Sequence, residues 1–108
     1  MGKHYLLDLY GCEFEVLDNL EFLLQLLVDS ALLCGATILN KCYHKFEPQG
    51  VTIILLLAES HISIHTVPEK GEAYVDVYTC SIVDPEISCL KIIDEIKPSR
   101  HNLRLFDR

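Results

Sequence analysis

The hydrophobic positions of this chain alternate over several short segments and repeat with a helical period over one long segment. Alternation over residues 4–10 predicts a first strand, which ends at Gly11. Between Val16 and Cys34, Leu, Phe and Val fill most positions and polar residues recur every three or four. These polar residues are Asp18, Glu21, Gln25 and Asp29. The pattern predicts one long helix, buried over most of its circumference and ended by Gly35. A membrane-spanning helix is the alternative, and the polar stripe argues against it.

The second half of the chain reads mainly as strands separated by turns. Strands are predicted at 36–46, 51–58, 61–65, 73–80 and 102–106, and a second helix at 87–96. The run of mostly branched residues at 51–58 predicts a central strand covered on both faces. Together these elements predict an α+β two-layer sandwich, with a mostly antiparallel sheet and two helices on one face. The other sheet face then needs cover, and a homodimer would provide it.

Composition narrows the classes of function. The chain has 108 residues, enough for a single domain, and its formal charge of −7 disfavours nucleic acid and anionic lipid as partners. No apolar run is long enough to span a membrane, and the first residues soon turn acidic, so we expect a cytoplasmic protein without a membrane contact. The five cysteines are odd in number and widely spaced. We therefore predict no disulfide framework and no metal site.

Candidate chemistry begins with the parity of residues 61–65. Ile62 and Ile64 point to one face of the predicted strand, while His61, Ser63 and His65 point to the other. A solvated strand face explains these polar residues without any function. A reactive site is the alternative, and it rests on the residues around this strand.

Three neighbouring features favour the reactive site. Glu59 and Ser60 lie in a tight break between two strands, where a hydroxyl can be held near the preceding carbonyl carbon. Thr52 lies on the adjoining strand, where a hairpin would bring its hydroxyl beside Ser60 or His65. Cys80 ends a later strand, and its thiol is expected to reach the same pocket.

The segment from Gly50 to Cys80 carries the motifs Glu-Ser-His, Ile-His-Thr, Pro-Glu and Asp-Val-Tyr-Thr-Cys in that order. In this order they resemble the core of the prokaryotic S-adenosylmethionine decarboxylase proenzymes, which depend on a pyruvoyl group. Similarity extends upstream to residues 11–19, 35–37 and 44–46, and fades after about Pro85.

This resemblance implies an enzyme that makes its own covalent cofactor. The hydroxyl of Ser60 would attack the carbonyl of Glu59, and the chain would be cut between them into residues 1–59 (the beta chain) and 60–108 (the alpha chain). Ser60 would become a pyruvoyl group, the electron sink for decarboxylation. His65 corresponds to the family's processing base, and an imidazole is suited to proton abstraction at cytoplasmic pH. Thr52 takes the place of a serine that assists processing.

The resemblance also implies roles in turnover. Cys80 matches the family's proton donor; by itself it would read as a buried apolar thiol. Phe46 matches an aromatic residue that stacks on the adenine, and Glu69 a carboxylate that binds the ribose, although a solvated turn residue is the alternative for Glu69. These sites form where two protomers meet, so we expect a homodimer of cleaved protomers acting on a small-molecule amine.

Three positions depart from the family pattern. Val67 stands where an aromatic residue is usual, and Ile53 and Ser81 stand where glycine is usual. These departures leave the processing residues in place and open the question of the substrate.

Three functions therefore remain. The first is decarboxylation of S-adenosylmethionine for spermidine biosynthesis. The second is the same pyruvoyl chemistry on arginine or ornithine, with Val67 as its only support in the sequence. The third is an unprocessed, non-catalytic relative. The sequence leaves open whether an activator such as putrescine is needed.

Overall fold

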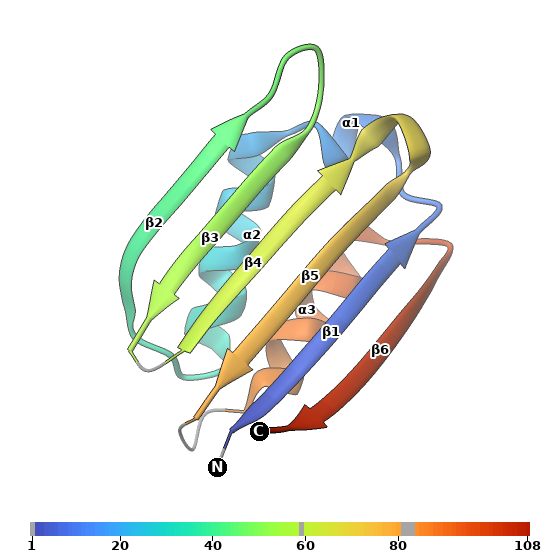
Figure 1. Ribbon diagram of the computed structural model, residues 1–108. Coiled ribbons are helices and arrows are strands. Elements are labelled where there is room, and N and C mark those ends of the chain that lie inside the picture. Colours follow the sequence, from blue (N-terminus) through green and yellow to red (C-terminus); the bar gives the residue numbers. More distant parts are fainter. Residues whose placement is uncertain (1, 59, 81–83) are drawn as a thin grey trace.

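A computed structural model of the chain describes residues 2–58, 60–80 and 84–108. Six strands form one antiparallel sheet in the order β2-β3-β4-β5-β1-β6, and the helices lie behind it (Figure 1). The strands are β1 (Lys3–Tyr10), β2 (Ile38–Lys45), β3 (Val51–Leu57), β4 (Ser60–Val67), β5 (Glu72–Thr79) and β6 (Arg100–Asp107). The predicted fold class, an α+β two-layer sandwich with helices on one face, is confirmed.

The long helix predicted between Val16 and Cys34 is two helices, so that prediction was wrong in one detail. α1 (Phe14–Leu17) and α2 (Leu20–Leu33) are separated because Asn19 caps the second helix: its side-chain oxygen accepts a hydrogen bond from the backbone N–H of Phe22 at 3.0 Å. α3 (Pro85–Ile96) begins in the same way, with Asp84 as its cap. Two consecutive polar residues, Asp18 and Asn19, mark the break, but Asp18 also fits the polar stripe of one continuous helix.

The core lies between the helices and one face of the sheet. Alternate residues of the central strands are completely buried there, including Ile53 of β3 and Ile62 and Ile64 of β4. On β4 the intervening His61, Ser63 and His65 point to the other face, as their parity predicted. We call this second face the open face of the sheet, because among the described residues no helix covers it (Figure 1).

The prediction that the strand at 51–58 is covered on both faces was wrong. Burial alternates along β3, and Ile54 and Leu56 are 44% and 51% exposed on the open face. Branched residues favour extended backbone wherever their side chains point, so a continuous apolar run does not reveal which face is covered. The pattern does leave apolar side chains on the open face, a point that matters below.

The two ends of β4 lie at opposite ends of the sheet, measured along the strands. β3 ends and β4 begins at the lower end of the sheet in Figure 1. At the upper end β4 leads into the short 3₁₀ helix η1 (Pro68–Lys70) and then into β5. In the described parts of the chain, no helix has the length and apolar character needed to cross a bilayer.

Candidate active site

The lower end of β4, which we call the Ser60 end, carries the predicted nucleophile. Ser60 is the first residue of β4 and is paired with Leu57 of β3 and Thr79 of β5. It is half-buried, and its hydroxyl lies 3.5 Å from the carbonyl oxygen of Ala58. Glu59, the predicted partner in cleavage, lies outside the described residues.

Cys80 belongs to the same end of the sheet. It directly follows Thr79, the residue paired with Ser60, and it is exposed. The predicted proximity of this thiol to Ser60 along the sheet edge therefore agrees with the strand register. Ser81, one of the three departures from the family pattern, lies outside the described residues, while Ile53 is fully buried in the core.

The upper end of β4, which we call the His65 end, carries the predicted processing pair. His65 is exposed on the open face and lies opposite Thr52 of β3. The Thr52 hydroxyl and Nδ1 of His65 are 2.9 Å apart and form a hydrogen bond, which does not involve Nε2 of the ring. Next to them, the buried Thr66 hydroxyl donates to the carbonyl oxygen of Leu17 and accepts from the backbone N–H of Val51. These bonds fix the backbone beneath His65.

The two ends are too far apart to form one site within a single chain. Ser60 and His65 are five strand positions apart, and at about 3.3 Å per residue this separation is roughly 17 Å. Of the two positions expected for the Thr52 hydroxyl, beside Ser60 or beside His65, the structure has the second. Cys80 lies at the Ser60 end, so within one chain it does not share a pocket with Thr52 and His65. A β-hairpin places partners opposite each other, and the register pairs Ser60 with Leu57 instead.

The predicted substrate residues also lie at the His65 end. Phe46 follows β2 and is 46% exposed, with its ring in edge contact with His44, the residue paired with Thr52. Val67 ends β4, and the exposed Glu69 follows it in η1. The residues assigned to substrate binding thus gather with His65, and the residues assigned to covalent chemistry and proton donation gather with Ser60.

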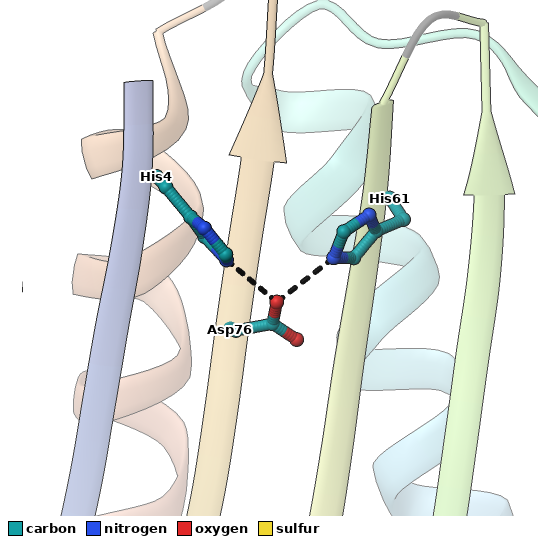
Figure 2. Close-up of side chains that lie close together, drawn as sticks. All are labelled: His4, His61 and Asp76. Carbon is teal, nitrogen blue, oxygen red and sulfur yellow. Dashed lines mark hydrogen bonds and ion pairs between the residues drawn. The ribbon is translucent and has the colours of Figure 1, made fainter. Parts of the chain in front are cut away.

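The sequence interpretation missed some polar residues of the open face. Tyr74 lies opposite His65, and its hydroxyl donates to a carboxylate oxygen of Glu72 at 2.5 Å. This hydrogen bond, together with burial and the nearby negative charge of Glu72, raises the pKa of Tyr74 to about 12. Closer to the Ser60 end, His4 and His61 both contact Asp76 (Figure 2). Their parity within three strands was visible in the sequence, but the register that brings them together was not.

Comparison with known proteins places this arrangement in a family. The family described as S-adenosylmethionine decarboxylase matches residues 3–108. This chain belongs to that family. The S-adenosylmethionine decarboxylase proenzyme of Parasynechococcus marenigrum is 51% identical over 100% of this chain and 85% of its own length. The proenzyme of a Geobacillus species is 46% identical over 89% of this chain and 77% of its own length.

Solved structures of the S-adenosylmethionine decarboxylase family agree in fold. The adenosylmethionine decarboxylase of Aquifex aeolicus superposes with a TM-score of 0.92 at 39% identity, over 100% of this chain and 90% of that one. The Trypanosoma brucei AdoMetDC shares the fold, with a TM-score of 0.71 at 14% identity over 95% of this chain and 45% of that chain. The family predicted from the motifs between Gly50 and Cys80 is confirmed.

Proposed function

We propose that this protein is a self-cleaving decarboxylase that converts S-adenosylmethionine to decarboxylated S-adenosylmethionine and carbon dioxide. The observation that carries the proposal is the family match over residues 3–108, in a chain whose Ser60 begins β4. The product supplies aminopropyl groups for spermidine biosynthesis, a cytoplasmic reaction.

Self-cleavage begins at Ser60. Its hydroxyl oxygen attacks the carbonyl carbon of Glu59, the amide C–N bond breaks, and an ester joins the two residues through the serine oxygen. Removal of the Cα proton of Ser60 then expels the Glu59 carboxylate. The remaining dehydroalanine takes up water and releases ammonia, which leaves a pyruvoyl group on residue 60. Relative to the intact chain, the two products together have gained one water and lost one ammonia.

The position of Ser60 suits such a group. As the first residue of a central strand it becomes a chain end without any strand being divided, and it is half-buried beside Thr79. A pyruvoyl carbonyl held there supplies the electron sink for loss of carbon dioxide from an amine substrate. We assign the return of a proton to the substrate carbon to Cys80, which follows Thr79 in the chain.

The base and the nucleophile are proposed to come from different copies of the chain. His65 and Thr52 lie roughly 17 Å along β4 from Ser60, farther than any side chain reaches. In a two-fold dimer whose strands run in opposite directions across the interface, the His65 end of one protomer meets the Ser60 end of its partner. Each dimer then contains two sites, each with Ser60 and Cys80 from one protomer and Thr52 and His65 from the other.

The open face of the sheet suits this pairing. Its exposed apolar side chains extend over several strands and include Ile54, Leu56, Tyr74 and Phe106. Exposed apolar side chains of this number on one sheet face, although polar residues of β4 and β5 lie between them, favour an interface. Packing the open faces of two copies together would cover both faces and join the complementary ends of β4.

Substrate recognition is assigned to the residues of the His65 end. The exposed ring of Phe46 is suited to stack on an adenine, and the carboxylate of Glu69 to accept hydrogen bonds from ribose hydroxyls. Val67 favours a second candidate, decarboxylation of arginine or ornithine, because an aromatic surface expected beside the nucleoside is replaced by a smaller side chain.

A panel of substrates tests the assignment. Purified enzyme is incubated separately with carboxyl-labelled S-adenosylmethionine, arginine and ornithine, and labelled carbon dioxide is measured. Release from S-adenosylmethionine is expected, and release from arginine or ornithine alone would transfer the function to the second candidate. No release from any of the three, in a chain that remains uncut, would support the non-catalytic relative.

A further inference from the structure

A compact polar cluster lies on the open face near the Ser60 end, and the reaction described above makes no use of it. His4 of β1, His61 of β4 and Asp76 of β5 point toward one another from three neighbouring strands (Figure 2). Nε2 of His4 and Nε2 of His61 lie 2.7 Å and 2.8 Å from the same oxygen, Oδ2 of Asp76. The other carboxylate oxygen of Asp76 accepts a hydrogen bond from the Ser63 hydroxyl.

The hydrogen bonds define where the protons lie. Nη1 of Arg108 is 3.1 Å from Nδ1 of His4, and because a guanidinium can only donate, Nδ1 must accept. The ring proton of His4 is then on Nε2, where it is donated to Asp76. His61 must also donate from Nε2, because an ionised carboxylate only accepts. Burial raises the pKa of Asp76, whereas the hydrogen bonds from Ser63, His61 and His4 lower it. The hydrogen bonds have the larger combined effect, so the pKa of Asp76 lies below its usual value.

A divalent metal is the main alternative for two imidazoles and a carboxylate. The ligand atoms of His4, His61 and Asp76 lie within 4.8 Å of one another, a set that zinc accepts. Binding a metal at Nε2 of His4 would move its proton to Nδ1, which faces the cation of Arg108. The hydrogen-bonded arrangement therefore favours a cluster held by protons and not by a metal.

The place of the cluster along the chain gives it a consequence after cleavage. A cut between residues 59 and 60 leaves His4 on the first fragment and His61 and Asp76 on the second. His61 becomes the second residue of a new chain end, and β4 loses its covalent link to β3 at that point. New chain ends fray unless side-chain contacts hold them.

We propose that the hydrogen bonds of His4 and His61 to Asp76 form a latch that keeps residue 60 in place once the chain has been cut. The latch rests on the proposed self-cleavage and adds a positioning role for three residues. His61 ties the new end to β5, and His4 ties β5 to the first fragment. The latch has little to do before cleavage, because the covalent β3–β4 connection already holds the start of β4.

This difference between the cut and uncut forms provides the test. His61→Leu removes the N–H donor, and it is made both in the otherwise unchanged chain and in a Ser60→Ala chain, which stays uncut. Amide hydrogen exchange is then measured at residues 61–63. We expect faster exchange on His61→Leu by tenfold or more in the cut protein and by less than twofold in the uncut background. Equal acceleration in both, or none in the cut protein, would overturn the latch.

Turnover gives a second readout. We expect His61→Leu to lower kcat 10- to 100-fold with little change in KM, because the substrate residues at the other end of β4 are untouched. His61→Gln, which keeps an N–H near the position of Nε2, should recover most of that loss. The matched control His101→Leu, an exposed histidine on β6, should change neither exchange nor kcat. An unrecovered His61→Gln together with unchanged exchange would contradict the proposal.

Three further outcomes are informative. If His61→Leu prevents cleavage, His4→Leu replaces it in the same comparison, since His4 is remote in sequence from the cut. If zinc chloride raises the melting temperature of the wild type but not of His4→Leu, the cluster is a metal site and the latch is wrong. If the wild type itself is never cut, the proposed function fails first, and that failure is recognised before any variant is made.

Discussion

The two ends of β4 differ in what they contribute. The Ser60 end carries the residues assigned to bond cleavage and proton donation, Ser60 and Cys80, at a turn where the chain can be opened without dividing a strand. The His65 end carries a hydrogen-bonded pair, Thr52 and His65, beside the residues assigned to the nucleoside. Each end is chemically incomplete, and the strand between them keeps them apart. If the proposed roles hold, one folded chain of this kind carries two half-sites that a second copy must complete.

The largest effect on the difference between the two ends is expected when the nucleophile is removed. Ser60→Ala should leave an uncut, folded chain with turnover at background, because no pyruvoyl group can form. The matched control is Ser63→Ala, three residues along the same strand, which should still be cut. Denaturing mass spectrometry and carbon dioxide release check both, and cleavage that persists in Ser60→Ala would move the site elsewhere.

The separation of the ends is tested by complementation. His65→Ala alone should stay uncut or stop at the ester. Co-expressed with Ser60→Ala, about half of the His65→Ala chains should be cut, the share that random pairing places in mixed dimers. Only a partner's His65 can rescue them. If His65→Ala is cut normally alone, His65 is not the processing base, and if mixing rescues nothing, the ends do not meet between copies.

A smaller effect separates processing from turnover within the Ser60 end. Cys80→Ala should be cut at least in part, since the thiol has no part in the ester step, but its turnover should fall about 10²- to 10⁴-fold for the loss of a general acid. Cys42→Ala, also exposed but on the edge strand β2, is the control and should behave as wild type. Unchanged turnover in Cys80→Ala would remove the thiol from the mechanism.

The smallest predicted effect concerns the pH dependence of stability. The pKa of Asp76 lies below its unfolded value, so the native state gains stability from its charge above about pH 4, and loses that stability as pH falls through the lowered pKa. Asp76→Asn should therefore cost about 1–2 kcal/mol at pH 7 and less at pH 3. Urea unfolding at the two pH values measures this, and an equal cost at both would exclude the charge as the cause.

Much of the fold was visible in the sequence, because alternation and helical period report directly on which side of an element is buried. Ile62 and Ile64 against His61 and His65 is the clearest example. The break before α2 was missed, because Asp18 fits the polar stripe of one continuous helix and the capping role of Asn19 depends on a hydrogen bond to Phe22. The exposed face of β3 could not be predicted from the sequence either, because apolar residues occupy both of its faces.

The candidate site was only partly predictable. The motifs named Ser60, His65 and Cys80, but their separation follows from strand register, which depends on hydrogen bonds between distant residues. For the same reason, the sequence did not predict the contact between Asp76 and His4, which lie 72 positions apart. Spacing along a sequence identified the chemistry, and only the register placed it at two ends.

The central claim is that the chain cuts itself before residue 60, and the intact mass of freshly purified protein tests it most directly. The account predicts two fragments, residues 1–59 and 60–108, with the second lighter by one ammonia than a fragment that begins with serine. A folded sample that retains one uncut chain after prolonged incubation would contradict it.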